Sequence, residues 1–324
     1  MADGSARVVL IALAGNLAIA LVKFVAWMFT GSTALFTEAI HSLVDTGDQV
    51  LLLVGQTRAK KPPDATHPLG YGMETYFWSF IVALMVFLVG GAVSIWQGIE
   101  RIRHPAPIEH PWLSYVVLGA SAVFEGTSFM AAYREYCYIV RGRRIPLWQF
   151  IKLSKDPGVF STLMEDGAAV TGLAIAALGV TGAAYLHAPW ADGAASIAIG
   201  LLLVWVATFL ANETRSLIAG EAAAPAVVEA VNDLICQDRR VVGLDEVLSL
   251  HLGPSNILFA ASVRFQEGLS GADVLDAAQE LAARVKTADK RIGLVFLRPH
   301  ETVAAAAKAA EAHGPVKGRT AGDS

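Results

Sequence analysis

Six stretches of the chain consist almost entirely of apolar residues, and each is about as long as a membrane-spanning helix. A helix needs about 20 apolar residues to cross the hydrocarbon core of a bilayer. Two of the stretches contain no charged residue, and three others are interrupted by acids. Six such stretches favour a membrane protein over a soluble protein with buried core helices. They are residues 8–30, 33–55, 76–97, 112–132, 158–180 and 193–212.

The pattern changes after about residue 213, where the apolar positions take on the shorter periods of a soluble domain. Residues 224–237 and 271–286 have helical periodicity, and Ser270 is placed to cap the second of these helices. The order helix-strand-strand-helix-strand (α-β-β-α-β) predicts a small α+β unit of the ferredoxin-like kind. The three predicted strands are residues 241–253, 256–265 and 292–299.

We therefore expect three parts. They are an all-α six-helix transmembrane domain over 1–212, a small α+β cytoplasmic domain over 213–300, and a largely disordered tail over 301–324. Composition agrees, because the chain is 54% hydrophobic and 17% charged with a mean hydropathy of +0.49, whereas about a quarter of an average soluble domain is charged. The net charge of −4 indicates no particular partner, and no nucleic-acid partner is expected.

The distribution of basic residues predicts the orientation in the membrane. By the positive-inside rule, loops rich in Lys and Arg face the cytoplasm, which places both termini there. Arg101 and Arg103, between the third and fourth runs, are a mild exception. The residues before the first run are too few for a transit peptide and do not resemble a cleaved signal, so a bacterial inner membrane is expected. The basic loop residues are Arg58, Lys60, Lys61, Arg141, Arg143, Arg144, Lys152 and Lys155.

The second apolar run is interrupted by TEAIHSLVDTGD, which contains Glu38, His41, Asp45 and Asp48. On a helix with about 100° per residue these four positions fall within an arc of about 80°. His41 and Asp45 are one turn apart and therefore meet on one face. A charge at the bilayer centre costs at least about 2.5 kcal/mol. Such a stripe must face a cavity, a partner or an ion.

The fifth run holds a second polar cluster, in which Glu165 and Asp166 are adjacent and Thr162 precedes Asp166 by one turn. Imidazole and carboxylate are ligands that Zn²⁺ accepts, usually in a tetrahedral site. His41 and Asp45 with Asp166 would supply three ligands, and the sequence offers no certain fourth. A buried polar network that only ties two helices together, or a proton relay without metal, are the alternatives.

Two further charged residues lie deep in apolar runs. Glu125 of the fourth run is either a buried hydrogen-bond partner or a proton or secondary site. Lys23 of the first run, with Asn16 nearby, could neutralise part of the acidic cluster. We expect instead that the long Lys23 side chain extends to the membrane surface.

The loop after the second run reads HPLGYGME over residues 67–74. With the HSLVD spacing of the second run, it resembles the cation diffusion facilitator family, whose loop typically reads His-Pro-x-Gly-x-Gly-x-x-Glu. The resemblance extends over about residues 8–299, because six helices followed by an α-β-β-α-β domain also match. The residues resembling the branch with the mitochondrial zinc exporters of animals are Phe160, Glu165, Asp166, Ala168 and Ala169.

The resemblance implies a homodimeric exporter of Zn²⁺ or a related divalent ion, driven by proton antiport. It also implies a transport site made of His41 and Asp45 with position 162 and Asp166. Thr162 departs from the family pattern, which has His or Asp at that position. Water or Glu165 could complete the site, and the cargo stays open among Zn²⁺, Mn²⁺, Co²⁺ and Fe²⁺.

The remaining polar candidates have secondary roles. Glu38 and Asp48 are assigned to gating or to a weaker secondary site. His67 either helps to form an interfacial metal site or shapes the turn around it. The cytoplasmic domain shows only His251 and His300, so we expect it to dimerise rather than to hold a regulatory metal cluster.

Two other classes of function compete with transport. One is a membrane-anchored metal-binding regulator that gives no flux, which the missing fourth ligand keeps open. The other is an intramembrane enzyme, against which the absence of HExxH, GxSxG and phosphate-loop motifs counts. We therefore expect no enzyme activity and no cofactor. The expected partners are divalent ions, protons, the lipid bilayer and a second copy of the chain, and the direction of transport is open.

Overall fold

The computed structural model describes residues 2–140, 145–147, 149–150 and 155–300 of the 324-residue chain. The expected disordered tail, 301–324, and the basic residues Arg141, Arg143, Arg144 and Lys152 lie outside them. The chain forms two compact units, Met1–Ala219 and Gly220–Ser324. The expected boundary at residue 212 lies within a helix that continues to Gly220.

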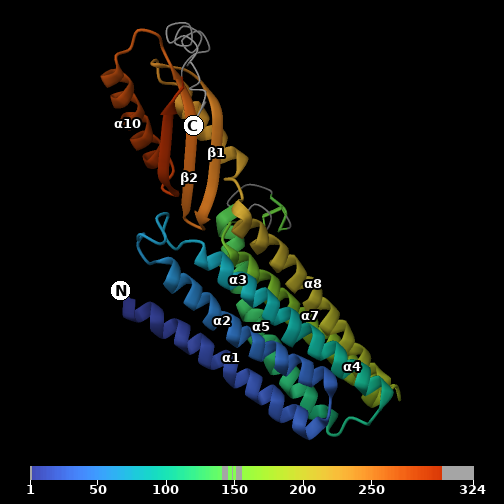
Figure 1. Ribbon diagram of the computed structural model, residues 1–324. Coiled ribbons are helices and arrows are strands. Elements are labelled where there is room, and N and C mark those ends of the chain that lie inside the picture. The colour runs from blue at the N-terminus through green and yellow to red at the C-terminus, as the bar shows by residue number, and fades with distance from the viewer. Residues whose placement is uncertain (1, 141–144, 148, 151–154, 301–324) are drawn as a thin grey trace, which may run out of the picture. The chain divides into compact units, whose positions relative to one another are not determined.

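The described residues of the first unit form long helices that lie side by side (Figure 1). The third of them is continuous over 30 residues, with a π-helical turn, η1, between α3 and α4. The helices are α1 Ala2–Thr30, α2 Thr33–Ala59, α3 Glu74–Met85, η1 Val86–Ala92, α4 Val93–Arg103, α5 Pro111–Val140, α7 Pro157–Tyr185 and α8 Trp190–Gly220.

Among the described residues, five helical segments are long and apolar enough to cross a membrane. They are α1, the continuous α3–η1–α4 segment, α5, α7 and the segment that begins at Trp190. Helix α2 has a similar length of 27 residues, but its charged residues keep it out of this group. The structure thus shows a multi-pass helical unit. Whether α2 is the predicted sixth span depends on whether its charged side chains face the interior of the unit or the lipid.

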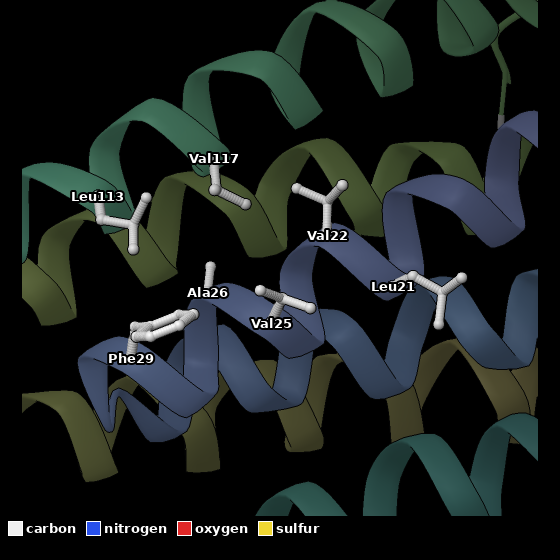
Figure 2. Close-up of a pocket in the computed structure, with 7 residues that line it drawn as sticks. All are labelled: Leu21, Val22, Val25, Ala26, Phe29, Leu113 and Val117. Atoms are coloured by element: carbon white, nitrogen blue, oxygen red, sulfur yellow. The ribbon is translucent and has the colours of Figure 1, made fainter.

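Many large apolar side chains of this unit are exposed, as expected for helices in contact with lipid. An open groove between α1 and α5 has a volume of about 370 Å³ (Figure 2). Only apolar side chains line this groove, and a contiguous apolar surface of this kind suits lipid acyl chains. The lining residues are Leu21, Val22, Val25, Ala26, Phe29, Leu113 and Val117.

Helices η1–α4 and α8 approach each other closely through glycines spaced seven residues apart. A Cβ atom added at Gly98 would lie 2.6 Å from the Gly193 carbonyl oxygen, and one added at Gly200 would lie 2.9 Å from that of Gly91. Small residues allow helix backbones in membranes to approach in this way. This contact fixes α8 against α4 beside the polar interior of the unit.

The second unit contains α9 Pro225–Cys236, β1 Val241–Gly253, β2 Asn256–Phe265, α10 Gly271–Ala288 and β3 Ile292–Pro299. The predicted helix-strand-strand-helix-strand order is present. The described sheet has the order β1-β2-β3, with β1 and β2 antiparallel and β2 and β3 parallel.

The core of the second unit lies between the helices and one face of the sheet. It includes Ile235 of α9, Phe259 of β2 and Leu281 of α10. Ser270 caps α10 as predicted, because its Oγ accepts from the Asp273 backbone N–H at 3.2 Å. Satisfying the unpaired N–H groups of the first turn stabilises the start of this helix.

Candidate functional site

The start of α2, the helix with the acidic stripe, is held by a carboxylate from α8. Asp192 is fully buried, and it accepts from the Ser32 hydroxyl at 2.5 Å and from the Thr33 backbone N–H at 2.6 Å. The Arg101 guanidinium lies 3.5 Å away. A negative charge at a helix N-terminus is favoured by the helix dipole. This contact fixes the position of the stripe relative to α4 and α8.

The acidic stripe of α2 faces the interior of the unit. Glu38, His41 and Asp48 are buried, and the Asp45 side chain is 17% exposed. The His41 Nδ1 lies 3.5 Å from the Asp45 Oδ1, as expected for residues one turn apart. Within the described part of the chain, neither His41 ring nitrogen nor either Asp48 oxygen has a hydrogen-bond partner. Buried polar atoms are costly when unpaired, so these atoms suit a cation or water that bonds to them.

Asp45 opens into a small cavity between α1, α2, α5 and α7, with a volume of about 50 Å³. A water molecule needs only about 10–15 Å³ measured in this way, so the cavity can hold a cation or several waters. The structure therefore brings together residues of the two clusters that were predicted from different helices. The lining residues are Asn16, Asp45, Gln49, Leu52, Glu125, Ser128, Thr162, Glu165 and Asp166.

The three α7 candidates differ in which oxygen atoms are available to bind a cation. The Asp166 Oδ2 accepts from the Ser128 hydroxyl at 2.8 Å. The Thr162 hydroxyl donates to the Gly158 carbonyl at 2.8 Å, which commits its proton and leaves its lone pairs for the cavity. Glu165 is buried, and its Oε1 has no hydrogen-bond partner among the described residues.

His41 is beside the cavity but is not among its lining residues. No three His, Cys, Asp or Glu side chains in the described residues are close enough to enclose a metal ion. Carboxylates that face one cavity repel each other. A cation in the cavity would offset this repulsion.

Lys23 does not extend to the membrane surface, and this prediction is wrong. Its side chain is fully buried, and its Nζ donates to the Ser42 hydroxyl at 2.7 Å. The Nζ also lies 3.2 Å from the Glu38 Oε2 and 3.4 Å from the Glu125 Oε1. Two carboxylates from neighbouring helices offset the cost of burying the ammonium group. Partners on α2 and α5 could not be identified from α1 alone.

The loop residue His67 belongs to an exposed turn that is organised by Asp64. The Asp64 carboxylate accepts from the Tyr71 hydroxyl at 2.6 Å and from the His67 backbone N–H at 2.8 Å. The hydrogen bond from Tyr71, with those from Thr66 and His67, holds the pKa of Asp64 well below its usual range. The His67 ring lies 4.1 Å from the Tyr71 ring, centroid to centroid. These contacts give His67 a role in the turn, and an interfacial metal site remains a prediction.

Two polar cavity residues were missed by sequence reasoning. Gln49 lies one turn after Asp45 on α2, and Ser128 lies three residues after Glu125 on α5. Their helical spacing from the acids was a usable signal. In the second unit His251 is buried, and His300 lies 3.9 Å from the Asp245 carboxylate. The two histidines thus have separate surroundings.

Residues 9–219 match the family model described as the cation efflux transmembrane domain. The chain belongs to this cation efflux family, also called the cation diffusion facilitators. The resemblance inferred from the loop and the second helix is confirmed.

Relatives from animals, plants and bacteria agree with this family. A protein from Xenopus laevis named "Proton-coupled zinc antiporter SLC30A9, mitochondrial" is 34% identical over 264 residues, which cover 81% of this chain and 47% of that protein. Metal tolerance protein C4 of Arabidopsis thaliana is 32% identical, over 81% of this chain and 57% of its own. Magnetosome protein MamM of Magnetospirillum gryphiswaldense is 26% identical, over 74% and 70%. The chain spans about half the length of the SLC30A9 relatives.

Proposed function

We propose that this protein carries a divalent metal cation, foremost Zn²⁺, across a membrane in exchange for protons. The observation that carries the proposal is the small cavity that Asp45 of α2 lines together with Glu165 and Asp166 of α7. The relatives named as a proton-coupled zinc antiporter and a metal tolerance protein support this cargo and this coupling. Their names also support a transporter rather than an enzyme.

We propose that α2 is the sixth membrane span. Its length matches that of its neighbours, and its acidic stripe is turned inward rather than toward lipid. An inward stripe avoids the cost of exposing charge to hydrocarbon. The second unit and both termini would then face the cytoplasm, and two copies of the chain would form a homodimer. We also propose a bacterial inner membrane, which the bacterial relative MamM supports, although the SLC30A9 relatives are named mitochondrial.

The proposed ligands are His41, Asp45 and Asp166, with Glu165 or Thr162 completing the site. Imidazole and carboxylate in a four-coordinate arrangement suit Zn²⁺. A second cargo class, Mn²⁺, Co²⁺ or Fe²⁺, is favoured by one observation. The acids and hydroxyls that line the cavity offer oxygen donors, while His41 stands outside the lining. Oxygen ligands suit Mn²⁺ in particular.

The proposed coupling is competition between metal and protons for one set of atoms. Carboxylates and imidazole bind metal only when they are deprotonated, so metal entry releases protons and proton entry releases metal. Alternating exposure of the cavity to the two sides of the membrane would complete the cycle.

The decisive experiment measures metal-driven proton flux in proteoliposomes that contain a pH-sensitive dye. Zn²⁺, Mn²⁺, Co²⁺, Fe²⁺ and Cd²⁺ are added in turn to the wild type, to Asp45→Ala and to Asp166→Ala. Asp276→Ala is the matched control, because Asp276 is exposed on α10 of the second unit. We expect flux for one or two ions, its loss in the two cavity variants and its retention in the control.

Two other outcomes would contradict the proposal. Metal binding in calorimetry without flux for any ion would favour the membrane-anchored regulator. Metal uptake, measured in parallel with a metal-sensitive dye, without accompanying proton movement would support transport of the metal but contradict proton antiport.

A further inference from the structure

Lys23 places an ammonium group, paired with carboxylates, inside the helical unit. Its side chain is 0% exposed, and its ammonium contacts Ser42 and Glu38 of α2 and Glu125 of α5. An ammonium group has three N–H donors. These three contacts use all of them, so the charge is held in one place by two helices.

Glu125 connects this charge to the cavity. Its Oε1 lies 3.4 Å from the Lys23 Nζ, and the same side chain lines the cavity with Asp45 and Asp166. A carboxylate that is already paired with an ammonium group attracts a second cation less strongly, because the ammonium repels that cation. Glu38 is the other anchor of Lys23, and it is not among the cavity-lining residues.

We infer that Lys23 is an internal counter-cation that weakens the binding of the divalent cargo in the cavity, acting as a positioning residue through Glu125. This inference rests on the proposed transport function. Four carboxylates line the cavity, and a divalent ion held by several of them would leave slowly. A conducting site must bind its ion weakly enough to release it. These four are Asp45, Glu125, Glu165 and Asp166.

The first part of the test compares charge removal with charge retention. The full chain is used in lipid nanodiscs for calorimetry with Zn²⁺ and in proteoliposomes for flux. We expect Lys23→Gln to bind Zn²⁺ about tenfold or more tightly, with KM and kcat both lowered, because repulsion is lost and release is slowed. Lys23→Arg keeps the charge and should stay within about threefold of wild type. Lys286→Gln, at an exposed position of α10, is the matched control.

The second part tests the route through Glu125. In a Glu125→Gln background the pairing is already gone, so adding Lys23→Gln should tighten Zn²⁺ binding by less than in the wild type, about threefold, through the remaining repulsion. If Lys23→Gln alone fails to fold, the comparison of Glu125→Gln with the Glu125→Gln/Lys23→Gln double variant still tests the role of Lys23. A purely structural Lys23 would instead give lower thermal stability with equal or weaker binding.

The outcomes separate this inference from the proposed function. Unchanged or weaker Zn²⁺ binding in folded Lys23→Gln protein, while the wild type binds and transports, overturns the role of Lys23 alone. A wild type that neither binds nor transports any of the tested ions overturns the proposed function, and the inference fails with it.

Discussion

Ser128 is the residue that orients one of the proposed ligands. Its hydroxyl donates to the Asp166 Oδ2 at 2.8 Å from the neighbouring helix. We expect Ser128→Ala to weaken metal binding about three- to tenfold, because a hydrogen bond to a charged group contributes about 1 kcal/mol or more and holds the carboxylate in place. Calorimetry and the KM of flux would measure this change.

The matched comparison is Ser128→Thr, which retains the hydroxyl and should bind metal nearly as wild type. Equal affinity in Ser128→Ala and wild type would show that Asp166 needs no orienting partner, or that Asp166 is not a ligand.

The residues of the site were predictable where both interacting side chains come from the same helix. His41 and Asp45 are one turn apart in sequence, and their side chains lie 3.5 Å apart. The Lys23 prediction was wrong because its partners, Glu38 and Glu125, come from two other helices. Ser128 and Gln49 carry no charge, so nothing in composition alone distinguishes them from other polar residues in apolar runs.

At the scale of helices, the contact between α4 and α8 depends on glycine. A Cβ atom at Gly98 would lie 2.6 Å from both the Gly193 carbonyl oxygen and an Ile197 side-chain atom, whereas one at Gly119 of α5 would meet nothing within 4 Å. We expect Gly98→Ala to lower the unfolding temperature in detergent. Gly119→Ala should leave it equal or slightly higher, because Ala exceeds Gly in helix propensity by about 1 kcal/mol.

These two variants make the same chemical change at positions with different surroundings. Equal unfolding temperatures for both would mean that α4 and α8 are free to separate, and close glycine packing would then not determine the arrangement of the unit.

The helices themselves were predictable to within a few residues at most ends, since length and apolar content determine them. The predicted second run at 33–55 became α2 at Thr33–Ala59, with the same first residue. The sequence analysis did not predict the π-helical turn Val86–Ala92, because helical periodicity does not reveal a change in hydrogen-bond spacing. The glycine contacts were also missed, since they depend on which helices become neighbours.

At the scale of the whole molecule, the described helices of the second unit leave one face of its sheet uncovered. Leu248 of β1, Ala260 of β2 and Phe296 of β3 form a row across the three strands, and Leu248 and Phe296 are more than half exposed. Glu246 and Arg298 lie 3.9 Å apart beside this row. An exposed apolar patch with a polar rim is typical of an interaction surface. The α-β-β-α-β order predicted this sheet, but not which of its faces remains open.

We therefore expect this face to support the proposed homodimer. Replacing Phe296 by Glu, or both Leu248 and Phe296 by Glu, puts charge at the centre of the apolar row and should shift the protein from dimer toward monomer. Light scattering after gel filtration in detergent would measure the mass. Leu275→Glu is the control, because Leu275 is similarly exposed but lies on α10, outside this row. A dimer that survives the double substitution would mean that the two copies associate through the helical unit instead, since the sheet face would then carry no necessary contact.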